Sequence, residues 1–186
     1  MVMPTKDQNR LLYLISLYSK PSENETQKVV WVRETALRAF MFEGIVKKVF
    51  EWDYAPASVM TADGRKFMNI SQEGEDDIND LREMGLMDAL KLSTSRHYYI
   101  TAYCITKKGQ TEVKKVPKTD KDPVDALVKC ECGGDLKAEE RDEKIILKCD
   151  ACRKKTESGI MDCEDVSYVS KAYIPHLPIS ARKGGA

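Results

Sequence analysis

The sequence of 186 residues predicts an α+β fold in two parts, a larger mixed domain followed by a small cysteine-bearing domain. Helical and strand-like apolar spacings alternate over residues 1–116, and two close pairs of cysteines follow after residue 129. Between them, residues 117–127 combine two prolines with charged residues and show no apolar periodicity, which predicts a linker. A hydrophobic fraction of 42% and a charged fraction of 32% are typical of a globular protein with a packed core.

Two helical segments open the first domain. Residues 7–18 carry apolar side chains at helical spacing, and Asp7 is placed to cap the first turn. Residues 30–50 predict a second helix that is interrupted near Gly44. After it, we expect Trp52 and Tyr54 to lie in a turn-rich loop that runs to residue 64.

The next stretch predicts a strand, a helix and a hairpin. Residues 66–70 form a short strand, and Ser71 is a suitable cap for a helix that runs to about Met84. Gly85 ends this helix, because glycine readily takes the left-handed conformation found after a helix. Residues 86–92 and 97–106 then alternate as the two arms of a hairpin.

This order, together with the steps Gly85-Leu86-Met87 and Ile105-Thr106-Lys107-Lys108-Gly109, resembles winged-helix domains, especially those of PadR-like regulators. The resemblance covers residues 71–109. It implies a winged-helix-like domain over residues 1–116, with residues 71–84 as the recognition helix and the hairpin as the wing. Winged helices serve DNA binding and protein assembly alike, so the resemblance leaves the function open.

The predicted recognition helix and the predicted wing differ in charge. The predicted recognition helix carries six carboxylates against Arg82, so DNA would repel it. The wing is basic and also carries tyrosines, a combination that can contact a phosphate backbone but that also suits an ordinary strand. The candidate contacts to a nucleic acid or protein partner are Lys91, Arg96, His97, Lys107, Lys108 and Trp52.

The cysteine pairs predict a bound Zn²⁺ ion. Cys130 and Cys132 are followed, after sixteen residues, by Cys149 and Cys152, and residues 136–138 and 144–148 can pair as strands between them. Four thiolates on two facing turns suit tetrahedral zinc, and the pattern resembles a zinc ribbon over residues 128–165. The first pair has one intervening residue instead of two, so Cys163 is an alternative ligand.

The predicted zinc is structural. Four thiolates close the coordination shell, whereas a catalytic zinc keeps an open position for water. The metal would staple a segment too small for a secure core of its own. Cys104 falls on an apolar strand face and is expected in the core. No catalytic motif stands out, so we expect a protein that is not an enzyme; a redox protein acting through Cys104 and Cys163 is a distant alternative.

The function that these features favour is that of a non-catalytic, zinc-stabilised adaptor or assembly subunit in a larger complex. The alternative is a DNA- or RNA-binding regulator that uses the basic wing and the zinc ribbon. Residues 166–186 would form a C-terminal arm that docks on a partner or packs back on the chain. The sequence shows no signal segment and no membrane helix, so we expect a cytoplasmic or other reducing location and no membrane partner. We also expect no small-molecule substrate.

Overall fold

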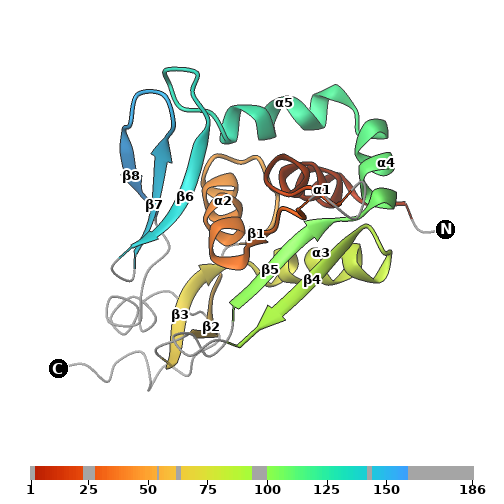
Figure 1. Ribbon diagram of the computed structural model, residues 1–186, viewed down its shortest axis with the longest axis horizontal. Coiled ribbons are helices and arrows are strands. Elements are labelled where there is room, and N and C mark those ends of the chain that lie inside the picture. Colours follow the sequence, from red (N-terminus) through yellow and green to blue (C-terminus); the bar gives the residue numbers. More distant parts are fainter. Residues whose placement is uncertain are drawn as a thin grey trace.

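The computed structural model describes residues 3–22, 28–53, 55–61, 64–93, 100–141 and 144–158. They form an α+β fold, as the sequence predicts (Figure 1). The strands make three antiparallel sheets, with the orders β1-β5-β4, β2-β3 and β6-β7-β8. No helix among these residues is both long and apolar enough to cross a membrane. The elements are α1 (Lys6–Tyr18), β1 (Val32–Arg33), α2 (Glu34–Val46), β2 (Ala55–Thr61), β3 (Gly64–Ile70), α3 (Gln72–Glu83), β4 (Met87–Leu92), β5 (Ile100–Ile105), α4 (Lys107–Lys115), α5 (Lys118–Leu127), β6 (Leu136–Arg141), β7 (Lys144–Cys149) and β8 (Lys155–Glu157).

Helix α1 forms the centre of the core. Its predicted apolar face is confirmed, and Leu11, Leu12, Leu14 and Ile15 are fully buried. The cap differs from the prediction, because the side chain of Thr5 accepts from the backbone N–H of Gln8 at 3.2 Å, and the backbone N–H of Thr5 donates to Gln8 Oε1 at 3.0 Å. This reciprocal pair satisfies the open N–H groups of the first turn. Asp7 instead accepts from the backbone N–H of Glu51 at 3.1 Å.

Helix α2 is shorter than the predicted helical stretch and ends near Gly44. The backbone carbonyl of Gly44 accepts from the N–H of Val49 at 2.7 Å, which folds the following chain back over the end of the helix. A Cβ on Gly44 would lie 2.4 Å from the ring of Phe50. The interruption at Gly44 therefore has a steric cause, since only glycine lets Phe50 pack against the helix backbone.

The predicted loop from Trp52 to residue 64 is wrong. Residues 55–61 form β2, which pairs with β3 from Ala55↔Ile70 to Thr61↔Gly64. Tyr54 lies outside the described residues. Trp52 itself is 6% exposed, and its ring stacks on Phe50 with centroids 4.0 Å apart. It belongs to the core and cannot serve as the surface contact that the sequence suggested.

The helix and hairpin predicted for residues 71–106 are confirmed where they are described. The hydroxyl of Ser71 accepts from the N–H of Gly74 at 3.3 Å and caps α3, and Gly85 ends the helix with φ +69°. Strand β4 pairs with β5 from Met87↔Ile105 to Leu92↔Ile100. Strand β1 pairs with the other edge of β5. The tip of the hairpin, with Arg96 and His97, falls on residues that the structure does not describe.

Two helices replace the end of the wing and the predicted linker. Lys107 and Lys108 lie in the first turn of α4 and not on the hairpin. Residues 118–127 form α5, which lies next to α1 in Figure 1. Val124 and Leu127 are buried, and the hydroxyl of Tyr13 donates to Asp125 at 2.8 Å. These contacts bind α5 to α1, so the segment is an integral part of the fold.

The cysteine-bearing sheet shares one apolar core with the rest of the chain. Ile145 and Leu147 on β7 are each 5% exposed and belong to the same buried cluster as the apolar face of α1. The hydroxyl of Tyr18 donates to the backbone carbonyl of Leu136 on β6 at 2.7 Å. The sequence predicts that a metal, and not an apolar interior, organises the region after residue 129. An apolar interior is present there, and it supports one face of the sheet.

Candidate metal centre

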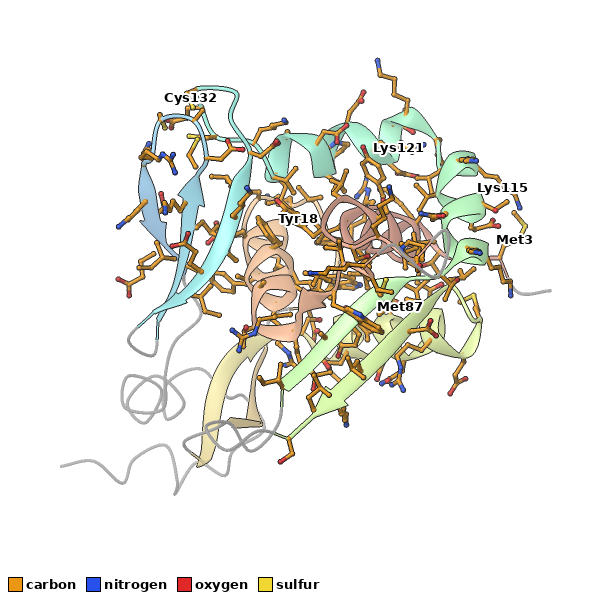
Figure 2. The ribbon with its side chains drawn as sticks, in the orientation of Figure 1. Met3, Tyr18, Met87, Lys115, Lys121 and Cys132 are labelled. Carbon is orange, nitrogen blue, oxygen red and sulfur yellow. The ribbon has the colours of Figure 1, made fainter. Side chains whose placement is uncertain are left out.

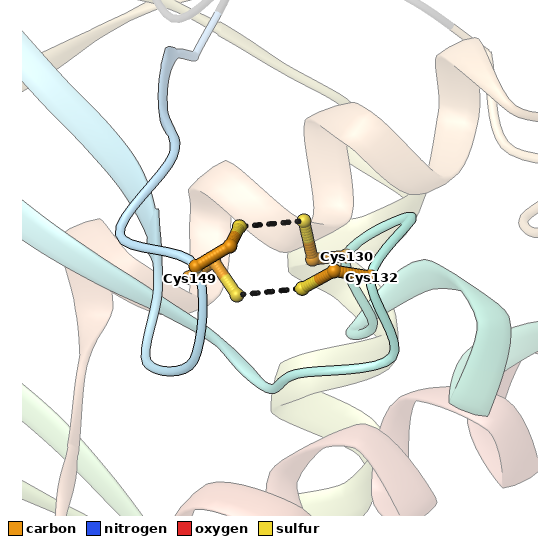
Figure 3. A group of neighbouring side chains, drawn as sticks. Cys130, Cys132 and Cys149 are labelled. Atoms are coloured by element: carbon orange, nitrogen blue, oxygen red, sulfur yellow. Dashed lines mark hydrogen bonds between the residues drawn. The ribbon is translucent and has the colours of Figure 1, made fainter.

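Two turns bring the four predicted cysteines together (Figure 3). Cys130 and Cys132 lie between α5 and β6, while Cys149 ends β7 and Cys152 lies in the turn before β8. All four Sγ atoms are within 4.8 Å of one another. The Sγ atoms of Cys130 and Cys152 are 3.8 Å apart, and those of Cys132 and Cys149 are 3.4 Å apart. The predicted cluster is therefore confirmed, and it could hold a metal ion.

The sulfur spacing fits a tetrahedral metal site. Four thiolates bound at about 2.3 Å to one ion place their sulfurs about 3.8 Å apart, close to the spacing seen here. A disulfide would need a separation of about 2.05 Å. All four cysteines are free thiols, and Cys149 is fully buried while Cys132 and Cys152 are exposed. The arrangement suits an ion held at the surface with one ligand anchored in the core.

Two glycines let the first cysteine turn approach the second. Gly133 has φ +86°, a conformation that other residues rarely adopt. A Cβ on Gly134 would lie 2.7 Å from the Sγ of Cys149 and 2.7 Å from the Cβ of Ala151. The backbone N–H of Cys130 donates to the carbonyl of Gly134 at 2.9 Å and closes the turn. The close approach of the two cysteine turns therefore depends on a glycine at residue 134.

Two hydrogen bonds between Asp135 and Asp150 join the two turns. The N–H of Asp135 donates to the Oδ1 of Asp150 at 2.9 Å, and the N–H of Asp150 donates to the carbonyl of Asp135 at 2.9 Å. This reciprocal pair fixes the positions of the cysteines on either side. Sequence reasoning missed this pair, although Asp135 directly follows the first cysteine turn and Asp150 lies within the second. The pair positions the ligands in the way that hydrogen bonds around a metal site commonly do.

Hydrogen bonds within the cluster shift the pKa values of Cys132 and Cys152 in opposite directions. The backbone N–H of Gly134 and the neighbouring thiols lower the pKa of Cys132 to about 6. The backbone N–H of Lys154 lowers the pKa of Cys152, but the hydrogen bonds of the other three thiols outweigh it and raise that pKa to about 12. Cys132 therefore loses its proton more easily than Cys152. A bound cation would replace the remaining protons and stabilise all four thiolates.

The other predicted site residues do not gather around one point. Lys91 is exposed on β4, and Lys107 and Lys108 are exposed on α4. Cys104 is 2% exposed and part of the interior, as predicted, and burial raises the pKa of its thiol. Cys163, the alternative metal ligand, lies outside the described residues, as do Arg96 and His97.

Buried charges elsewhere bind the elements to one another. Arg38 on α2 is 7% exposed, and its Nη2 lies 2.9 Å from Glu34 and 3.1 Å from Glu75 on α3. The hydroxyl of Tyr103 on β5 donates to the same Glu34 at 3.1 Å. Sequence reasoning missed this network, although an arginine on an otherwise apolar helix face was a signal. It connects α2, α3 and the central strand of the β1-β5-β4 sheet.

A cavity of about 760 Å³ opens at the C-terminal end of α3. Its walls combine apolar side chains, including two methionines, with charged side chains of both signs. They come from the segment before α1, from α1 itself, from α3 and the turn that follows it, and from α4. The lining includes Met3, Asp80, Glu83, Met84, Leu86 and Lys108.

The family of the chain follows from residues 7–158, which match the model described as the uncharacterized protein MJ1567 family. Neither a curated protein nor a solved structure matches the chain. The matched range starts in the first turn of α1, ends just after β8 and includes the four clustered cysteines. The chain therefore belongs to the uncharacterized protein MJ1567 family.

Proposed function

We propose that the chain is a non-catalytic, zinc-stabilised adaptor that makes protein–protein contacts in a larger assembly. It would do so from a winged-helix-like domain, residues 1–116, joined to a zinc ribbon, residues 128–165. The observation that carries the proposal is the acidic exposed face of α3. A DNA-reading winged helix presents its recognition helix at this position, where positive charge would be needed.

The order of the elements supports a winged-helix-like domain. Helix α1, strand β1, helices α2 and α3 and the hairpin β4-β5 follow one another in the order of a winged helix. The short first strand pairs with the last strand of the hairpin, which gives the sheet order β1-β5-β4. The β2-β3 hairpin would be an insertion between the second and third helices. The hairpin β4-β5 would then be the wing.

The donor set supports zinc and a structural role. Four thiolates are soft ligands that zinc prefers, and a shell completed by all four leaves no position for water or substrate. When bound, zinc would cross-link the two turns and neutralise part of their charge. Cys130 and Cys132 would hold it from the end of α5, and Cys149 and Cys152 from the β7-β8 turn.

The carboxylates of α3 divide into an inner and an outer set. Glu75 contacts buried Arg38 at 3.1 Å, and Asp77 accepts from the indole of Trp52 at 2.7 Å. Asp76 and Glu83 are exposed and lie on one side of the helix, seven residues apart. Their negative charge would attract a basic protein surface and speed its encounter with α3.

The cavity at the end of α3 supports the proposal that α3 contacts a protein partner. Met3, Met84 and Leu86 give it apolar walls, and Asp80 and Glu83 contribute negative charge beside them. A partner could insert an apolar side chain there while its basic neighbours face the carboxylates. Buried anchors of this kind supply most of the binding energy at many interfaces. Methionine walls adapt readily to the shape of such an anchor.

Metal analysis of the purified chain tests the zinc. We expect one zinc ion per chain, lost in Cys130→Ser/Cys132→Ser. Strong chelator should lower the unfolding temperature, because the ion binds only the folded chain. Purified chain that contains no zinc and keeps its full stability in chelator would contradict the proposal.

Affinity capture from the source cells tests the adaptor role. Asp76→Lys/Glu83→Lys reverses the outer charge of α3 without removing a contact to the core, and we expect it to lose partners that the wild-type chain retains. The matched control is Asp88→Lys/Glu139→Lys, which changes the charge equally at exposed positions elsewhere. Partners retained by both variants, measured by quantitative mass spectrometry, would exclude α3 as the contact surface.

A further inference from the structure

Lysines are concentrated along α4 and in the first turn of α5. Residues 107–121 carry six lysines against two carboxylates, in a chain whose total charge is balanced at 30 against 30. Figure 2 places Lys115 on α4 and Lys121 on α5. We call this surface the α4–α5 lysine face; it consists of Lys107, Lys108, Lys114, Lys115, Lys118 and Lys121.

Helical spacing sorts the lysines of α4 into two rows. Lys107 and Lys114 are seven residues apart and form one row, and Lys108 and Lys115 form the next. The second row lines the cavity beside the acidic end of α3. The first row lies outside that lining, and Lys118 follows it at the start of α5. All three side chains of the outer set, Lys107, Lys114 and Lys118, are exposed.

The outer set has no partner of opposite charge within the described part of the chain. Neither an ion pair nor a hydrogen bond engages the side chains of Lys107, Lys114 or Lys118 there. The two carboxylates of the segment are used elsewhere, since Glu112 pairs with Lys115 at 2.8 Å and Asp120 lies 3.3 Å from Arg10. The positive charge of the outer set is therefore available to a ligand.

The first turn of α4 adds to the positive electrostatic potential of these lysines. Lys107 and Lys108 occupy the first turn, which contains no acidic residue. The N-terminal end of a helix carries partial positive charge, so lysines there weaken the helix and an anion there strengthens it. The chain thus keeps two cations where they are unfavourable for folding and favourable for binding an anion.

Close contacts with the α3–β4 junction hold α4 in place. A Cβ on Gly109 would lie 2.0 Å from the carbonyl oxygen of Leu86, so the helix backbone rests directly on this step. The hydroxyl of Thr106 donates to the carbonyl of Gly85 at 2.8 Å and accepts from the N–H of Gly109 at 3.0 Å. The lysines therefore project from a fixed support, which limits the ordering cost of binding.

We propose that the α4–α5 lysine face binds the phosphate backbone of duplex DNA through Lys107, Lys114 and Lys118. The segment 107–121 contains no aromatic residue on which an unpaired base could stack, which favours a duplex over a single strand. Contact to the backbone gives affinity without reading base sequence. This role goes beyond the protein-binding role of α3, and it does not depend on it, because the two surfaces use different residues.

Salt-dependent binding tests the proposal. Fluorescence anisotropy of a labelled duplex of about 20 base pairs would be measured with the zinc-loaded full chain between about 50 and 200 mM salt. We expect Lys107→Gln/Lys114→Gln/Lys118→Gln to weaken binding at least about tenfold and to reduce the slope of log K against log salt by about 2.7. Glutamine keeps helix propensity close to that of lysine, so the fold should persist. Circular dichroism and zinc content verify this.

Two matched controls separate this face from the hairpin and the cysteine-bearing sheet. Lys47→Gln/Lys137→Gln/Lys155→Gln removes three positive charges at exposed positions just after α2, on β6 and on β8, and Lys91→Gln removes one on β4. We expect both controls to bind DNA with nearly the wild-type affinity and the wild-type slope of log K against log salt. A loss equal to that of the first variant in either control overturns the proposal.

Competitor ligands test the choice of duplex DNA. We expect duplex DNA of unrelated sequence to compete fully and polyglutamate of equal charge to compete poorly. Polyglutamate that competes as well as DNA would assign the face to an acidic protein, and duplex RNA bound about tenfold more tightly would assign it to RNA. Either result overturns the proposal, as does the absence of measurable binding to DNA at about 50 mM salt.

Discussion

The indole nitrogen of Trp52 donates a hydrogen bond of 2.7 Å to the Oδ2 of Asp77 on α3. The other oxygen of Asp77 accepts from the side chain of Gln8 on α1 at 2.8 Å. One carboxylate therefore connects α1, α3 and the segment after α2. Burial raises the pKa of Asp77, while these two hydrogen bonds hold the charged form and oppose that rise. The acidic sequence of α3 thus has a structural role on its inner side.

Replacing this tryptophan should destabilise the fold. Trp52→Phe keeps an aromatic ring against Phe50 but leaves Asp77 Oδ2 without its indole donor, and we expect a loss of about 1–3 kcal/mol in the free energy of unfolding. Urea denaturation followed by circular dichroism measures it. Trp31→Phe, at a half-buried position, is the control and should cost less. Equal losses would show that the hydrogen bond contributes little.

A methyl group at residue 134 should weaken the metal site. In Gly134→Ala the new Cβ meets Cys149 Sγ and Ala151 Cβ, so the two turns must separate. We expect zinc affinity to fall on the order of 10- to 100-fold, as for other residues that position ligands. Competition with a chromophoric chelator measures this. Gly133→Ala introduces backbone strain at φ +86° without a close contact, and it should retain more affinity.

Truncating a core residue of β7 should destabilise the whole chain. Leu147→Ala removes a side chain that is 5% exposed and part of the common apolar cluster, and we expect a loss of about 2–5 kcal/mol. Because the cluster is continuous, tryptophan fluorescence and far-ultraviolet circular dichroism should report one transition at the same urea concentration. Two separate transitions would show that the cysteine-bearing sheet unfolds alone.

The buried carboxylate of Glu75 should give a pH-dependent stability. Desolvation raises the pKa of Glu75 above its usual value of 4.5, and Arg38 offsets this only in part. The folded chain therefore holds this proton more tightly than the unfolded chain, and the resulting stability is lost as the pH rises through the folded-state pKa. Glu75→Gln has no such proton. We expect the stability of the variant relative to wild type to increase from about pH 5 to about pH 8.

Urea denaturation at both pH values measures this difference. The titration of groups far from residue 75 affects both proteins equally and cancels in the comparison. A constant difference between the two proteins at both pH values would mean that Glu75 keeps its ordinary pKa in the folded chain.

The sequence predicted the parts of the fold that depend on local signals. Ser71 and Gly85 delimit α3 because a capping hydroxyl and a left-handed glycine act within a single turn. The spacing of the four cysteines was equally local within each pair, and the strands between the pairs could be inferred from their length. The cluster in Figure 3 follows from these two signals.

The parts that it missed depend on contacts between distant residues. Helix α5 carries only Val124 and Leu127 on its buried face, and Asp120 completes that face by contacting Arg10 on α1. Prolines at 117 and 123 and the surrounding charges are typical of a linker, and only the partner on α1 reveals the helix. The burial of Trp52 likewise depends on Asp77, twenty-five residues later.

The end of α5 lies only three residues before the first cysteine of the metal centre. Leu127 is 1% exposed in the common core, and Cys130 follows after Val128 and Lys129. So short a connection keeps the first cysteine turn close to the end of α5. The position of Cys130 is therefore linked to α5 and, through the ion pair between Asp120 and Arg10, to α1.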